Sequence, residues 1–168
     1  SMIANDMMSF IKSDLAVFGL GVALVFCLML YLFFQNLWFV FLPLFNALIT
    51  TVFTASILGL MDWKISVISS NFIALLLILT ISLTVHVLVR FTELSKVAHT
   101  TDDAIYLSLN QMVMPCLFAA LTTAIAFLSL IMGDIKPVIE FGKMMSVGMA
   151  FAFILTFTFL PAAMKLVI

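Results

Sequence analysis

Charged side chains are scarce in this sequence: Lys, Arg, Asp and Glu together make up 9% of its 168 residues. Hydrophobic residues make up 65%, far above the share in soluble domains of this length. The net charge of −1 leaves no basic field for nucleic acid. The sequence also contains no basic cluster, glycine-rich phosphate loop or metal-ligand spacing. The composition therefore indicates an integral membrane protein, excludes nucleic acid as a partner, and predicts neither a metal nor a cofactor.

Cysteine is also scarce. The two cysteines, Cys27 and Cys116, each lie inside an apolar stretch. In such surroundings a thiol behaves as a small hydrophobic side chain, and a disulfide between the two is not expected. The cysteines therefore give no information about the redox compartment.

Long apolar runs fill most of the remaining sequence. A bilayer core of about 30 Å needs roughly 20 apolar residues in helical form, and five runs reach that length. The five predicted spans cover residues 16–34, 37–61, 65–89, 112–132 and 141–164. Lipid offers the backbone no hydrogen-bond partners, so such runs are predicted to be helices. The expected fold class is all-α, a polytopic membrane protein with five transmembrane helices in an antiparallel bundle.

The connections between these spans are short, with one exception. The short ones cover residues 35–36, 62–64 and 133–137. The longer connector, residues 90–110, offers Thr100 or Thr101 as a helix cap, followed by Asp102 and Asp103, which suit a helix N-terminus. We predict that this connector forms a short amphipathic helix along the membrane surface and leads into the fourth span.

Residues 1–15 precede the first span. Within them, residues 3–13 alternate apolar and polar side chains with a helical period. They are predicted either to lie in the membrane interface or to be the end of a domain that comes before them. The five-helix transmembrane unit then covers residues 16–168.

Several polar side chains interrupt the spans. Asn46, Thr50 and Thr54 follow one another at steps of four residues in the second span, with Thr51 beside them. Their polar groups can bond back to their own helix or reach a neighbouring one. The other polar candidates for the membrane interior are Asn71, Thr122 and Thr123. Both helix packing and a functional role stay open for this set.

A polar stripe crosses the third span. Ser82, His86 and Arg90 follow at steps of four residues, and Glu93 lies one turn beyond the arginine. Ionisable residues within an apolar span are costly and tend to mark a transport or relay path.

Two interpretations of the stripe are open. In the first, His86 takes part in a proton path, because imidazole changes its charge within the physiological pH range. In the second, Arg90 and Glu93 lie at the headgroup boundary, and His86 is an interior residue bonded to a hydroxyl of a neighbouring helix. No span supplies a carboxylate at membrane depth, which favours the second interpretation. The pair of Ser82 and His86 also lacks a third, orienting acid, so an enzyme active site is not predicted.

Four sequence blocks resemble the resistance-nodulation-division (RND) superfamily of exporters, in particular its MMPL-like branch, which includes mycobacterial large membrane exporters and hopanoid transporters. The block Val85–Phe91 (VHVLVRF) is similar to the family's fourth transmembrane helix, where an acidic residue precedes a His and an Arg. The other blocks are Leu121–Leu130 (LTTAIAFLSL), Asp134–Gly142 (DIKPVIEFG) and Phe159–Ala162 (FLPA). The resemblance covers nearly the whole chain.

The resemblance implies an architecture and a set of partners. The chain would correspond to helices two to six of one six-helix half, a unit that sterol-sensing domains share. The N-terminus would be periplasmic, the C-terminus and residues 90–110 cytoplasmic, and the location the bacterial inner membrane; the charges alone favour neither orientation. The implied partners are membrane lipids, a hydrophobic substrate, the other transmembrane half and extracytoplasmic domains, with a second copy of the protein left open.

The sequence departs from the family pattern at Ser82. Members that use the proton gradient carry Asp at this position, four residues before the His. A hydroxyl cannot hold a transported proton as a carboxylate does, so only His86 and Arg90 are carried over as relay candidates. We expect the transmembrane part of an exporter of lipids or other hydrophobic compounds. The alternative is a lipid-binding or regulatory membrane module that does not transport.

Overall fold

The computed structural model describes residues 2–63 and 71–168. The chain divides into two compact units, one ending at Val40 and the other beginning at Phe41. All regular secondary structure in the described residues is helical, and five helices are long and apolar enough to cross a membrane. The predicted fold class, an all-α membrane protein with five spanning helices, is confirmed.

The first unit contains α1 (Met2–Phe34) and the start of α2 (Leu37–Leu60). The sequence predicts a separate segment over residues 1–15, whereas the helix is continuous from Met2. No glycine or proline precedes Gly19, so nothing in the first turns interrupts the helix. With 33 residues α1 is about 50 Å long, so it extends beyond a hydrocarbon core of about 30 Å.

A tight turn joins α1 to α2. Gln35 adopts a positive φ of 52°. The side-chain oxygen of Asn36 then accepts a hydrogen bond of 3.1 Å from the backbone N–H of Trp38. This bond satisfies one of the N–H groups that the start of α2 leaves without an intrahelical partner.

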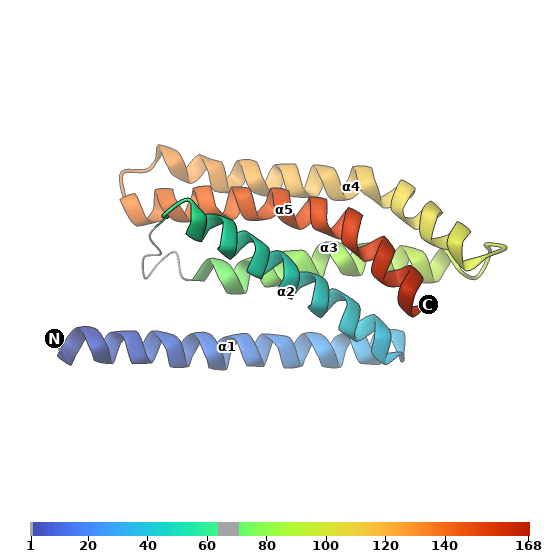
Figure 1. Cartoon of the computed structure of the whole chain (residues 1–168), viewed down its shortest axis with the longest axis horizontal. Coiled ribbons are helices and arrows are strands. Elements are labelled where there is room, and N and C mark those ends of the chain that lie inside the picture. The colour runs from blue at the N-terminus through green and yellow to red at the C-terminus, as the bar shows by residue number, and fades with distance from the viewer. Residues whose placement is uncertain (1, 64–70) are drawn as a thin grey trace. The chain divides into compact units, whose positions relative to one another are not determined.

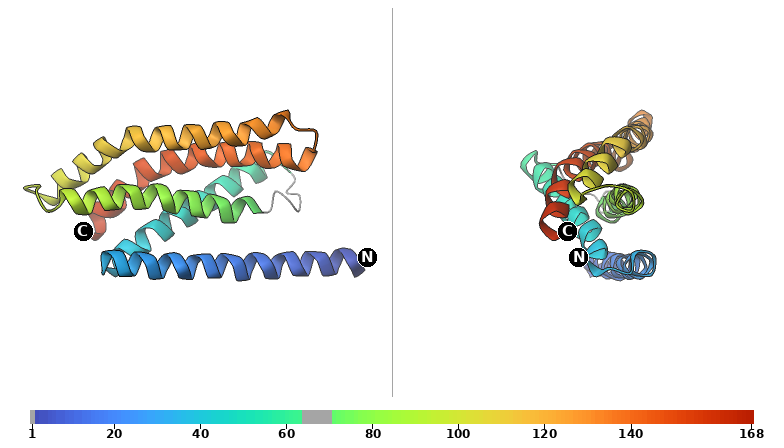
Figure 2. Two further views of the ribbon diagram at one scale, coloured as in Figure 1. Left: turned by 180° about the vertical axis from the view of Figure 1, so that it is seen from behind. Right: turned by 90° about the vertical axis from the view of Figure 1, so that its right-hand side faces the viewer.

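The second unit contains the rest of α2 and four further helices. These are α3 (Phe72–Leu94), α4 (Thr101–Ser129), the short 3₁₀ helix η2 (Leu130–Met132) and α5 (Lys136–Val167). Helix α5 packs against both α3 and α4, and Figures 1 and 2 show these three running alongside one another with α2 inclined across them. The predicted start of the third span, near residue 65, lies outside the described residues.

Helix α4 begins where the sequence predicts a cap but has no break afterwards. The hydroxyl of Thr100 accepts a hydrogen bond from the backbone N–H of Asp103 at 3.2 Å, so Thr100, one of the two predicted candidates, is the cap. The helix then continues through Pro115 to Ser129, so the predicted surface helix and fourth span form one helix. A proline inside a membrane helix is tolerated because neighbouring groups can satisfy the freed backbone carbonyl.

Helices α4 and α5 approach each other closely near their connection. A Cβ atom added at Gly142 would overlap the backbone carbonyl oxygen of Phe127. The rings of Phe127 and Phe141 meet edge to face beside this contact, with centroids 5.8 Å apart. In lipid the hydrophobic effect does not favour the association of helices. Small residues such as Gly142 allow close van der Waals packing of the two backbones, which stabilises the pair.

Candidate functional site

The stripe on α3 lies on an outward face of the second unit. Ser82 and His86 are exposed, whereas Leu83, Thr84 and Val87 on the other side of the helix are buried. Among the described residues, no hydrogen bond or ion pair involves Ser82 or His86. The face of α3 that carries His86 turns away from the described helices of this unit, which supply no hydroxyl partner for it, so the two interpretations of the stripe both stay predictions.

The far end of the stripe is connected to α4. Arg90 forms an ion pair of 2.5 Å with Glu93, and both side chains are partly exposed. The guanidinium Nε of Arg90 also donates a hydrogen bond of 2.7 Å to the side-chain oxygen of Gln111. Gln111 was not among the predicted site residues, because only the packing of α3 against α4 brings it to Arg90. The arrangement holds the Arg90 charge at the end of the stripe.

A second polar group lies in the interior, between α2, α3 and α5. The side-chain amide of Asn46 donates to the hydroxyl oxygens of Thr84 at 2.8 Å and Thr156 at 3.0 Å. All three residues are fully buried. Asn46 thus joins three helices at one level, and we call these three residues the polar clasp. Thr84 and Thr156 were not predicted, since a lone threonine in an apolar span gives no sign of which helix it faces.

Other polar groups of α2 follow the polar clasp along the helix and have no hydrogen-bond partner. The side-chain carbonyl oxygen of Asn46, Oδ1, accepts no hydrogen bond. The hydroxyls of Thr50, Thr51 and Thr54 have no hydrogen-bond partner either. Thr50 and Thr54 are fully buried, and Thr51 is 7% exposed. A buried polar group without a hydrogen bond costs roughly 1 to 3 kcal/mol in proteins. The structure thus places the predicted residues Asn46, Thr50 and Thr54 on one buried face of α2, and three of their polar atoms lack a hydrogen bond.

The remaining predicted polar residues do not join either group. Asn71 is exposed at the start of α3. Thr122 is exposed and its hydroxyl bonds back to the carbonyls of Phe118 and Ala119. Thr123 is half-buried on the same helix.

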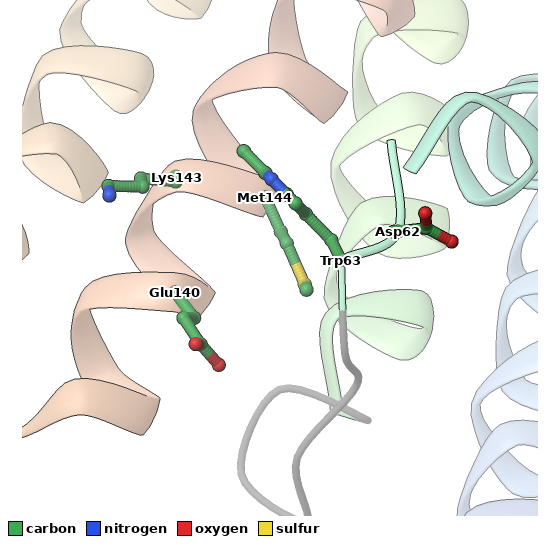
Figure 3. A pocket seen from close by; sticks show the side chains of 5 residues that line it. All are labelled: Asp62, Trp63, Glu140, Lys143 and Met144. Atoms are coloured by element: carbon green, nitrogen blue, oxygen red, sulfur yellow. The ribbon is translucent and has the colours of Figure 1, made fainter. Parts of the chain in front are cut away.

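A pocket of about 320 Å³ lies where the end of α2 approaches the start of α5. It is lined by Asp62, Trp63, Glu140, Lys143 and Met144. Figure 3 shows Trp63 extending toward Met144, while Asp62 and Lys143 point to opposite sides. The charged groups thus do not converge on one point. Across the described chain, no three His, Cys, Asp or Glu side chains gather as metal ligands would.

Comparisons with known proteins point to one family. The family model described as "MMPL family" matches residues 1–167. The hopanoid transporter HpnN of Rhodopseudomonas palustris is 26% identical over 164 residues, which are 98% of this chain and 19% of that protein. Membrane protein MJ1562 of Methanocaldococcus jannaschii is 26% identical over 121 residues, 72% of this chain and 31% of that protein. The chain thus spans less than a third of the length of either relative. No solved structure matches it significantly.

Proposed function

Since the chain belongs to the MMPL family, we propose that it is the transmembrane part of an RND-type exporter that moves lipids or other hydrophobic compounds across or out of the inner membrane. The family match over residues 1–167 is the observation that carries this proposal. The relative from R. palustris, whose name states that it transports hopanoids, supports a lipid as the class of substrate. The role is transport rather than catalysis.

The position of the stripe supports packing of α3 against another part of the full-length protein. Ser82 and His86 are polar, exposed and located within a helix long and apolar enough to span a membrane. Lipid tails offer such groups no hydrogen bonds, so they belong against protein or a water-filled path. We assign this face to the other transmembrane half of the full-length protein, with His86 and Arg90 as the relay candidates. The resemblance to the family further implies a periplasmic N-terminus and a cytoplasmic C-terminus.

The test is lipid movement by the full-length protein. The purified protein would be placed in vesicles that contain a fluorescently labelled phospholipid or a labelled hopanoid. Transfer of label to acceptor vesicles would be recorded with and without an imposed pH gradient. Transfer above that of protein-free vesicles is expected, and an absence of transfer with both lipids would contradict the proposal.

The second candidate is a lipid-binding or regulatory module that does not transport. It is favoured by Ser82, which places a hydroxyl where a proton-coupled family member carries a carboxylate. In the same experiment, binding of labelled lipid without transfer, and without dependence on the pH gradient, would identify this function.

A further inference from the structure

The unpartnered hydroxyls of α2 differ from several other threonine hydroxyls in the described helices. A threonine or serine inside a membrane helix usually donates to the carbonyl four residues before it. Thr80, Thr84 and Thr158 do so, with distances of 2.7, 2.9 and 2.8 Å to the carbonyls of Leu76, Thr80 and Ile154. Thr50, Thr51 and Thr54 do not, although they are buried. Their hydroxyls are thus available to a partner other than their own helix.

The contacts between α2 and α5 show what lies opposite these hydroxyls. Phe45 contacts Phe159, and Phe53 contacts Phe151, so a step of eight residues up α2 matches eight residues down α5. By the same count from the Asn46 to Thr156 bond, Thr50 is level with Ala152, and Thr54 is level with Gly148. Both opposing residues are small and buried. Neither side chain can serve as a hydrogen-bond partner.

Helix α3 forms no hydrogen bond with these hydroxyls either. Counting from the Asn46 to Thr84 bond, Thr50 is level with Thr80, and Thr54 is level with Leu76. The hydroxyl of Thr80 donates to its own helix, and Leu76 is apolar. The residues level with Thr50 and Thr54 on α3 and α5 are therefore small or apolar or, in the case of Thr80, already donate to their own helix.

The spacing of the polar atoms suits one particular ligand. Groups four residues apart on a helix face lie about 5 to 6 Å apart. One water molecule with two hydrogen bonds of about 2.8 Å each bridges that separation. Asn46 Oδ1 accepts, while each hydroxyl donates and accepts, so every member of the row can bind water. A sodium ion fits less well, because the row lacks a carboxylate to balance a charge at membrane depth.

We propose that Asn46, Thr50 and Thr54 form an internal water-binding seam, with Thr51 at its side, in which single waters bridge successive polar groups between α2, α3 and α5. The seam follows eight residues of helix, or about 12 Å, against a bilayer core of about 30 Å. It is an internal hydration site and does not cross the membrane. Bound water relieves the cost of the unpartnered groups and gives α2 exchangeable contacts with its neighbours. The inference is independent of what the whole protein transports.

Buried methionines on α5 provide the probe for this seam. Met149 is 2% exposed, is next to Gly148, and lies two turns from Thr156 on the same helix face. Met144 and Met164 are fully buried but lie nearer the two ends of α5. X-ray radiolysis of water generates hydroxyl radicals in place, and mass spectrometry locates the methionine sulfoxide that forms. Radicals from bulk water would reach Met144 and Met164 before the deeper Met149.

In the full-length protein in lipid bilayers, we expect Met149 to be oxidised several-fold faster than Met144 and Met164. The Thr50→Val variant, which removes one hydroxyl from the seam, should lower the Met149 rate several-fold. Thr158→Val removes an exposed hydroxyl bonded to its own helix and should leave that rate unchanged. Oxidation of Met149 no faster than that of the two control methionines would overturn the proposal. A Met149 rate that Thr50→Val leaves unchanged would also overturn it.

The same variants give a second measurement. If the seam were dry, Thr50→Val would remove an unsatisfied buried group and raise the unfolding temperature. With bound water it removes hydrogen bonds, and the unfolding temperature falls. An increase in unfolding temperature would therefore also overturn the proposal.

Discussion

The side-chain amide of Asn46 on α2 donates a hydrogen bond of 2.8 Å to the hydroxyl of Thr84 on α3, across 38 residues of sequence. Thr84 lies on the buried face of α3, while Ser82 and His86, two residues before and after it, lie on the exposed face. The bond, together with buried apolar side chains such as Val87 and Leu88, keeps this face of α3 turned inward. With Thr84 turned inward, the same helix presents Ser82 and His86 outward.

Replacement of Asn46 should loosen this arrangement. Asn46→Ala removes the bonds to Thr84 and Thr156, and we expect a loss of about 1 to 2 kcal/mol in the free energy of unfolding. Asn110→Ala is the control, because Asn110 is exposed on α4 and should give a value close to wild type. Unfolding in detergent, followed by circular dichroism, measures both. Equal stability of the two variants would show that the polar clasp contributes nothing.

The close approach of α4 and α5 is tested at Gly142. In Gly142→Ala the new methyl group would overlap the carbonyl oxygen of Phe127, and relief of that overlap should cost about 1 to 3 kcal/mol. Gly21→Ala is the matched control, because a Cβ there meets no atom within 4 Å. In the control, the higher helix propensity of alanine should leave stability unchanged or raise it by up to about 1 kcal/mol. The unfolding temperatures of the two variants provide the measurement. If α4 and α5 were only loosely in contact at Gly142, the two variants would have similar unfolding temperatures.

Ser82 stands where the carboxylate of a proton relay would be expected, but it has neither a carboxylate nor a hydrogen-bond partner in the described structure. Ser82→Ala should therefore leave lipid transfer by the full-length protein near the wild-type rate. The labelled-lipid assay described above measures this directly. A large loss of transfer would contradict this expectation. It would show that the Ser82 hydroxyl has a role in transport or acts as a nucleophile.

Much of this fold could be predicted from sequence, because long apolar runs in lipid have to form helices. A cap at Thr100 or Thr101 was also predictable, since hydroxyls just before two aspartates suit a helix N-terminus, but only the structure shows that Thr100 is the cap. Helix lengths were harder: α1 and α4 are each continuous where two segments were expected, because polar side chains alone do not end a helix. The partners of Asn46 and Arg90 depend on which helix faces meet. That relationship is tertiary, and no spacing within one segment encodes it.

The stripe on α3 is the feature that connects the structure most directly with the proposed transport. Arg90 is in contact with Glu93 and Gln111, so its removal changes both a charge and a contact between α3 and α4. Gln111→Ala separates the two effects, because it breaks the same contact with α4 and leaves the charge in place. His86 has no such contact, so His86→Ala tests the side chain alone.

The most direct measurement is therefore labelled-lipid transfer by full-length wild-type protein and by the His86→Ala, Arg90→Ala and Gln111→Ala variants, each at equal amounts in the vesicle membrane. If the exporter uses this stripe, His86→Ala and Arg90→Ala should each cause a large loss of transfer, and Gln111→Ala should transfer lipid at close to the wild-type rate. Wild-type transfer in both the His86 and the Arg90 variants would remove the stripe from the mechanism and contradict the account.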